Sequence, residues 1–159
     1  MTRFYLTTAL LALILSGVAL WQSLHYTSAE KPAYVIGLGE IMTAVQMRHA
    51  KLGIAGQNAN WELAAYELDE LDEGLEDALT WHPNHKSVPR PLTDMIPDYT
   101  KQPMADLRAA VAAQDSKLFA ASFDALTGSC NACHQEAKFG FNRVINPTGS
   151  PVSNQDFRP

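Results

Sequence analysis

The strongest pattern in this chain is a helical one. Between residues 61 and 79 the apolar side chains recur every three or four residues, which is the period of one face of an α-helix. The stripe consists of Trp61, Ala64, Ala65, Leu68, Leu71, Leu75 and Leu79. The opposite face is acidic, because residues 62–77 carry eight Asp and Glu and no Lys or Arg. Asn58 or Asn60 can cap this helix, whose apolar face must be covered by other helices.

Three further segments show the same period. We expect one helix over 34–56 and a short one over 103–114, with Pro103 as its first residue. Asp115 can cap a fourth helix, which Gly140 can end. The stripe of this fourth helix consists of Phe119, Phe123, Leu126, Cys130, Cys133 and Ala137.

The connections and the ends of the chain complete the predicted architecture. Five prolines between 81 and 103 interrupt any helix or central strand there and predict a long crossover loop. No segment shows the alternation of a strand. The sequence therefore predicts an all-α fold, an antiparallel four-helix bundle over 30–138 with an irregular C-terminal tail over 139–159.

Composition fits one globular domain and excludes one class of partner. Of the 159 residues, 47% are hydrophobic and 18% are charged, which is a globular composition. Twelve Lys and Arg against 17 Asp and Glu give a net charge of −5, and no basic run exceeds two residues. Nucleic-acid binding needs clustered positive charge, so we expect no nucleic-acid partner.

The first 29 residues have the layout of an export segment. Arg3 precedes an apolar run over 6–21, and the next charge is Glu30. The run matches the core of a signal peptide and is slightly shorter than the roughly 20 residues of a membrane span. Two interpretations stay open, cleavage after the small residues at 27–29 or an uncleaved membrane anchor through 4–21. A core helix of a cytoplasmic protein fits less well, because such a helix normally has a polar face. In either preferred case the folded domain lies in the periplasm.

Cys130, Cys133 and His134 form the arrangement by which a c-type haem is attached to a protein. The two thiols add to the haem vinyl groups, and the His that follows binds the iron. On a helix these three side chains emerge on one side within a single turn, because they are three and four residues apart. The motif therefore predicts one covalently attached haem c.

Three other uses of the two cysteines fit less well. A disulfide between residues three apart on a helix needs distorted geometry. A thioredoxin-like pair stands at the start of a helix, whereas Cys130 and Cys133 stand near the end of one. A zinc site needs a fourth ligand, and the chain has no second Cys pair.

Residues 104–139 resemble the cytochromes c prime, the class II c-type cytochromes. The segment MADLRAAVAAQDSKLFAASFDALTGSCNACHQEAKF has an Ala-rich helix, a charged turn and spaced Phe residues before the haem motif. The resemblance implies an exported four-helix bundle that pairs as a homodimer, with thioether bonds at Cys130 and Cys133 and His134 as the proximal iron ligand. This chain departs from the family at two points. Asn131 stands where many members have Lys, and the tail extends beyond their usual end.

The resemblance places the first helix on the distal side of the haem, where a sixth iron ligand would come from. His49 lies on the inward stripe of that helix, an unusual place for an imidazole without a partner. Iron is one such partner, which makes His49 a candidate ligand beside His134. A hydrogen bond to a haem propionate, to Tyr66 or to Glu67 is the alternative. Met42 is the second candidate for the sixth position.

Other side chains are candidates for contacts with the haem. Arg48 can pair with a propionate, as the resemblance suggests for an Arg of the first helix, or lie solvated on the surface. The alternatives for this role are Lys138 and Arg143. Trp61 is a candidate wall of the haem pocket or a core residue. His82 and His85 flank a proline in the loop, but two His without a fixed carboxylate indicate a metal site only weakly.

Two functions from different classes follow. The first is an electron carrier, in which the axial ligands set the potential and the acidic face over 62–77 steers a basic redox partner protein. The alternative is a binding protein for nitric oxide or carbon monoxide with an open distal site. A haem enzyme fits least, because Arg48 and His49 are neighbours on a helix and point about 100° apart.

Overall fold

The described part of the chain is entirely helical apart from turns and irregular segments. The computed structural model describes residues 14–18, 20–21 and 34–159, and none of these residues forms a strand. The predicted all-α class is therefore confirmed.

The chain divides into two compact units, Met1–Tyr34 and Val35–Pro159. In the first unit, residues 14–18 and 20–21 are helical, and the rest of the predicted export segment lies outside the described residues. No helix within the described ranges has both the length and the apolar character that crossing a membrane requires.

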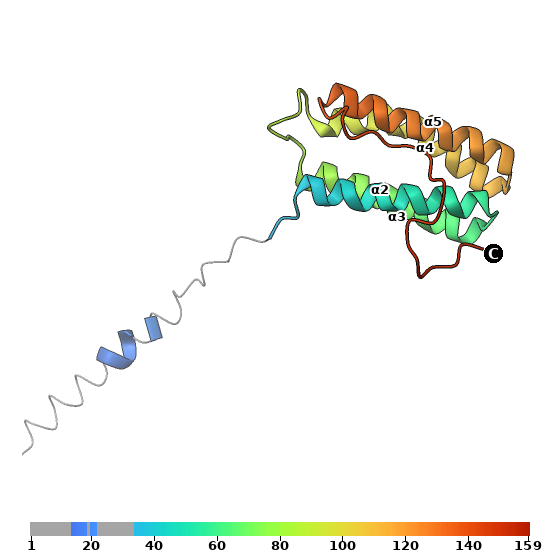
Figure 1. Ribbon diagram of the computed structural model, residues 1–159. Helices are drawn as coiled ribbons and strands as arrows, with labels where there is room; N and C mark the ends of the chain where they lie inside the picture. The colour runs from blue at the N-terminus through green and yellow to red at the C-terminus, as the bar shows by residue number, and fades with distance from the viewer. Residues whose placement is uncertain (1–13, 19, 22–33) are drawn as a thin grey trace, which may run out of the picture. The chain divides into compact units, whose positions relative to one another are not determined.

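Four helices build the second unit (Figure 1). They are α2 (Leu38–Gln57), α3 (Trp61–Trp81), α4 (Leu92–Ala113) and α5 (Ser116–Glu136). Short turns join α2 to α3 and α4 to α5 as antiparallel pairs, and the pairs meet through α3 with α4 and α2 with α5. These contacts support the predicted four-helix bundle. Its core is mostly Leu, Ile, Met and Phe from the inward stripes.

Two of the predicted helix caps are present. The side chain of Asn60 accepts a hydrogen bond from Leu63 N at 3.1 Å at the start of α3. Asp115 Oδ1 accepts from Lys117 N and Leu118 N, both at 2.9 Å, at the start of α5. Each cap satisfies backbone donors that a helix leaves open in its first turn.

Helix α4 is much longer than the third helix that the sequence predicts, and the expectation that this helix begins at Pro103 is wrong. It begins at Leu92 and contains both Pro97 and Pro103. A proline inside a helix costs about 3 kcal/mol or more, because it removes a hydrogen bond and crowds the preceding turn. Burial of a large apolar side chain contributes about 1.5–3 kcal/mol, and α4 buries enough of them to outweigh both prolines. Its buried residues are Leu92, Met95, Ile96, Thr100, Met104, Leu107, Ala110 and Val111.

Helix α5 ends at Glu136. The sequence predicts an end at Gly140, four residues later. Phe139 N donates to the carbonyl of His134 at 2.8 Å, and Lys138 takes the left-handed conformation with φ of 67°. This is the turn that usually places glycine at the left-handed position. A lysine there costs about 1 kcal/mol. The turn directs the tail back along α5.

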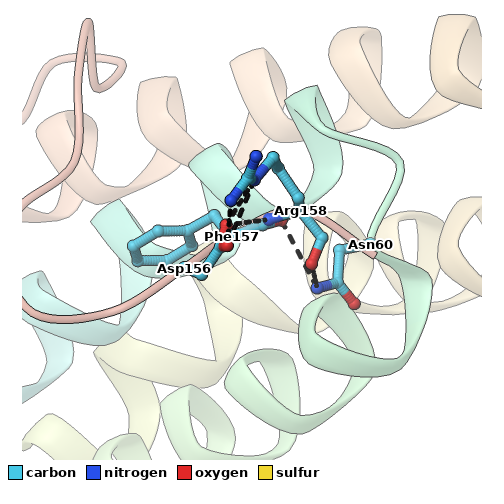
Figure 2. Close-up of polar contacts among 4 residues, drawn as sticks. All are labelled: Asn60, Asp156, Phe157 and Arg158. Atoms are coloured by element: carbon cyan, nitrogen blue, oxygen red, sulfur yellow. Dashed lines mark hydrogen bonds and ion pairs between the residues drawn. The ribbon is translucent and has the colours of Figure 1, made fainter.

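The C-terminal tail is irregular, as predicted, and it is part of the packed unit. It runs back along the bundle toward the turn between α2 and α3 (dark red in Figure 1). Phe157 is only 5% exposed and belongs to the core. Figure 2 shows the Asn60 amide beside the tail, where it donates to the carbonyls of Phe157 at 3.3 Å and Arg158 at 3.0 Å. Asp156 and Arg158 form an ion pair at the same place.

Replacing Phe157 by Ala should lower the free energy of unfolding by about 3 kcal/mol, because the ring leaves a cavity in the core. Phe141→Ala is the matched control, since the Phe141 side chain is 78% exposed in the same tail. Urea denaturation followed by far-UV circular dichroism measures both. Equal, small losses would show that the tail does not contribute to the core.

Candidate functional site

The two thiols and the imidazole of the predicted motif lie together near the end of α5. Cys130, Cys133 and His134 all fall within the last two turns of this helix, and each is half-buried. Both cysteines are free thiols. The structure thus places the three side chains on one helix, as the motif requires for attachment of a planar group at two edges.

The imidazole of His134 is held by the backbone of the tail. Its Nδ1 lies 2.6 Å from the carbonyl oxygen of Asn142. A carbonyl only accepts, so Nδ1 carries the proton and donates it, and Nε2 keeps its lone pair. Within the described residues, Nε2 has no hydrogen-bond partner. A metal-ligating His usually has this arrangement, with the second ring nitrogen bound to a carbonyl or carboxylate.

The environment of the thiols does not suit a dithiol redox couple. Burial raises the pKa of Cys130 to about 11, and the neighbouring Cys133 adds to the shift. Burial likewise raises the pKa of Cys133 to about 11, with Glu136 as the next cause. Reactive cysteines of thioredoxin-like sites have lowered pKa values instead. The two thiols are therefore almost fully protonated at neutral pH.

His49 lies at the contact between α2 and α5. It is 3% exposed, its ring stacks on Phe123 at 4.5 Å between centroids, and Nε2 lies 2.9 Å from Thr127 Oγ1. The hydroxyl of Thr127 also reaches two acceptors, Phe123 O at 3.0 Å and Asn146 Oδ1 at 2.8 Å. In either tautomer His49 Nε2 is engaged with Thr127, because as the donor it carries the proton and as the acceptor its lone pair binds the hydroxyl proton. The Nε2 atom of His49 thus has no lone pair free for a metal.

The contact between His49 and Thr127 fixes the position of α2 relative to α5 along the helix axes. The two helices are antiparallel, and His49 bonds Thr127. Two helical turns further, Met42 lies seven residues before His49 and His134 lies seven residues after Thr127. Residues seven apart share a helix face. Met42 is therefore the residue of α2 that is level with His134, and His49 lies about 10 Å away along the helix axis.

The end of the bundle around the motif is incompletely covered by protein. Several apolar side chains there pack against the core but stay partly exposed. They are Leu38, Met42, Val45, Leu79, Val88, Tyr99 and Phe139. They come from the start of α2, the end of α3, the loop over 82–91, the start of α4 and the turn after α5. Two thiols, an imidazole with a free lone pair and a half-covered apolar surround fit a haem.

The two basic residues of α2, Arg48 and Lys51, form ion pairs with glutamates of α3. Arg48 Nη1 lies 3.1 Å from Glu67 Oε2, and its Nη2 lies 2.7 Å from Glu70 Oε2. Lys51 Nζ lies 2.5 Å from Glu67 Oε1. Glu67 is fully buried, and a buried carboxylate without cationic partners is strongly destabilising. The structure therefore gives Arg48 an ion-pairing role within the bundle and does not bring it to the motif.

Trp61 lies apart from the motif, and the structure gives His82 and His85 contacts of their own. Trp61 packs edge-on against Phe119, with ring centroids 5.8 Å apart, at the opposite end of α5 from His134. The rings of His82 and His85 are 6.3 Å apart, and His82 Nε2 lies 2.8 Å from the carbonyl oxygen of Ile36. Within the described residues, no three or more His, Cys, Asp or Glu side chains gather as a metal site.

Two partners of the site were not predicted from the sequence. The hydrogen-bond partner of His49 is Thr127, and the partner of His134 is the carbonyl of Asn142. The seven-residue spacing between Thr127 and His134 is a signal that could have identified Thr127. A backbone carbonyl leaves no mark in a sequence, so Asn142 could not be found in this way.

No protein-family model matches the chain, and the searches of curated proteins and of solved structures find no match either. Its function is therefore inferred from the motif and from the contacts around it.

The buried imidazole of His49 should make stability depend on pH. Burial lowers its pKa to about 4 from an ordinary value of 6.5. Between these values the unfolded chain binds a proton that the folded chain excludes, so the free energy of unfolding falls as the pH falls. The His49 contribution is about 3 kcal/mol between pH 7 and pH 4. Urea denaturation of the protein and of His49→Gln, which cannot titrate, should show this difference in slope. Parallel pH profiles would contradict it.

Proposed function

We propose that this protein is an exported monohaem c-type cytochrome that transfers electrons. The observation that carries the proposal is the set of two free thiols and one imidazole at the end of α5, with Nδ1 of His134 bound to Asn142. This set presents two attachment points and one nitrogen lone pair on a single helix, as the resemblance to the cytochromes c prime implies. An export segment over residues 1–29 agrees with haem attachment outside the cytoplasm.

Each of these residues would have a separate task. Cys130 and Cys133 would hold the haem through thioether bonds, and His134 Nε2 would ligate the iron. The bound haem supplies one-electron chemistry. The protein holds the imidazole in one orientation through Asn142, and the apolar ends of α2 and α3 limit access of water. No side chain of the site has to exchange a proton during electron transfer.

The relative position of α2 and α5 along the bundle favours Met42 as the sixth ligand. If His134 and a residue of α2 together held the haem, the two residues would have to lie at one level of the bundle. Met42 satisfies this condition with His134, and its thioether is a known axial ligand that raises the potential. His49 lies two turns away, and its Nε2 is bound to Thr127. A site closed by Met42 would serve electron transfer rather than gas binding.

The acidic face of α3 could orient a basic redox partner toward this end of the bundle. Arg108 neutralises Asp69 and Asp72 in the middle of the helix. Glu73, Glu76 and Asp77 are exposed on the last two turns, at the same end as the haem motif. Complementary charge near the redox group speeds association.

An absorption spectrum tests the function directly. The protein is expressed with haem-attachment machinery, and spectra are taken oxidised, reduced, and reduced with carbon monoxide. We expect a covalent haem with a low-spin spectrum that carbon monoxide does not change, because both axial positions are occupied. A high-spin spectrum that shifts with the gas would favour the gas-binding alternative. Absence of covalent haem from the protein but not from a control cytochrome would overturn the proposal.

Substitutions on α2 identify the sixth ligand. Met42→Ala should convert the spectrum to high spin and allow carbon monoxide to bind, because the thioether is lost. His49→Gln is the matched control from the same helix face, and it should stay low-spin. The opposite result, with loss of the low-spin spectrum only in His49→Gln, would assign the sixth position to His49.

A further inference from the structure

Asn131, the first variable residue of the haem motif, ties the tail to α5. Its Nδ2 donates to the carbonyl of Val144 at 2.8 Å, and its Oδ1 accepts from Val144 N, also at 2.8 Å. The same Nδ2 donates to the carbonyl of Thr127 at 3.0 Å within the helix. The side chain thus satisfies both backbone groups of Val144, much as a strand partner would.

Three further bonds hold the tail on either side of Asn131. Toward the end of α5, the carbonyl of Asn142 accepts from His134 Nδ1 at 2.6 Å. Toward its start, Asn146 bonds Thr127 at 2.8 Å and also bonds Asp124. Residues 142, 144 and 146 therefore contact α5 at three successive levels, and Asn131 supplies the central and two-sided one.

This attachment matters because the Asn142 carbonyl lies in a segment without secondary structure. The turn after α5 brings Asn142 near the helix, where Asn142 N donates to Phe139 O at 2.8 Å. Beyond this turn, the bonds from the Asn131 side chain to Val144 are the attachment to α5 that follows next along the chain. If residue 144 moved away, the carbonyl two residues before it would lose its fixed position relative to the imidazole.

The carbonyl has a chemical effect on the imidazole that it binds. An acceptor on Nδ1 selects the tautomer that leaves Nε2 unprotonated, fixes the ring orientation and raises the basicity of Nε2. A more basic axial ligand stabilises the oxidised iron relative to the reduced iron. The position of the tail would thereby influence the reduction potential.

We propose, on the basis of the proposed haem function, that Asn131 is a positioning residue that holds the tail so that the Asn142 carbonyl orients and polarises His134. This assigns a common role to the two features in which the chain departs from the cytochromes c prime, the Asn inside the motif and the extended tail. Asn131 acts through Val144 and Asn142, and it does not itself contact the iron ligand.

Asn131→Ala in the full chain tests this role in the haem-loaded protein. Outer-shell partners of metal ligands change affinity or activity by 10- to 100-fold when they are replaced. We expect at least a tenfold shift of the equilibrium toward reduced iron, which is about 59 mV upward for one electron. Redox titration measures the potential. Gln57→Ala is the matched control, because it removes another side-chain bond to the tail, from Gln57 Nε2 to Pro147 O at 3.3 Å, away from Asn142.

A second measurement does not depend on the haem. In the haem-free full-length protein, nitrogen-15 NMR of the imidazole distinguishes the two tautomers of His134. We expect the Nδ1–H tautomer in the parent protein and in Gln57→Ala, and a mixture of tautomers in Asn131→Ala. Thermal denaturation shows whether each variant is folded at the measurement temperature.

The outcomes separate this inference from the proposed function. Failure of the parent protein to take up haem would overturn the proposed function, while the tautomer measurement would still test the position of the tail. The inference is wrong if folded Asn131→Ala keeps both the potential and the tautomer of the parent protein. It is also wrong if Gln57→Ala shifts them as much as Asn131→Ala does.

Discussion

The close approach of α2 to α5 depends on two glycines, and the geometry of the site depends on that approach. A Cβ atom on Gly53 would lie 2.6 Å from the ring of Phe123 and 2.7 Å from the ring of Pro147, and one on Gly56 would overlap the ring of Phe119. No other residue fits at either position without displacing an aromatic ring. Because the rings lock α2 against α5 at one level, they also determine which residues of α2 lie level with Cys130, Cys133 and His134.

The tail extends this arrangement from packing to chemistry. Pro147 touches α2 at Gly53, and Asn146 joins the polar group formed by His49 and Thr127. His49 and His134 thereby have opposite roles. The Nε2 of His49 is hydrogen-bonded to Thr127 inside the bundle, whereas Nδ1 of His134 donates to the tail and leaves Nε2 available. The hydrogen bonds, rather than the residue type, distinguish a structural His from a candidate ligand.

Much of the fold could be predicted from helical period and capping. Helices α2, α3 and α5 and the caps at Asn60 and Asp115 follow from local rules, which depend only on residues close together in the sequence. The start of α4 could not be predicted in this way, because two prolines oppose the helix and only the burial of side chains against other helices outweighs them. The end of α5 was missed for a related reason, since Lys138 takes the conformation that glycine usually supplies.

The same distinction explains how far the sequence could go at the site. The motif on α5 is local, so its three residues could be identified from spacing alone. Met42 and His49 lie on the same face of α2. The helical period identifies that face but does not show which of its residues lies level with His134, so spacing alone leaves both as candidates. They differ by two turns, which is about 10 Å. Only the contact of α2 with α5 resolves this offset, because it places Met42 rather than His49 level with His134.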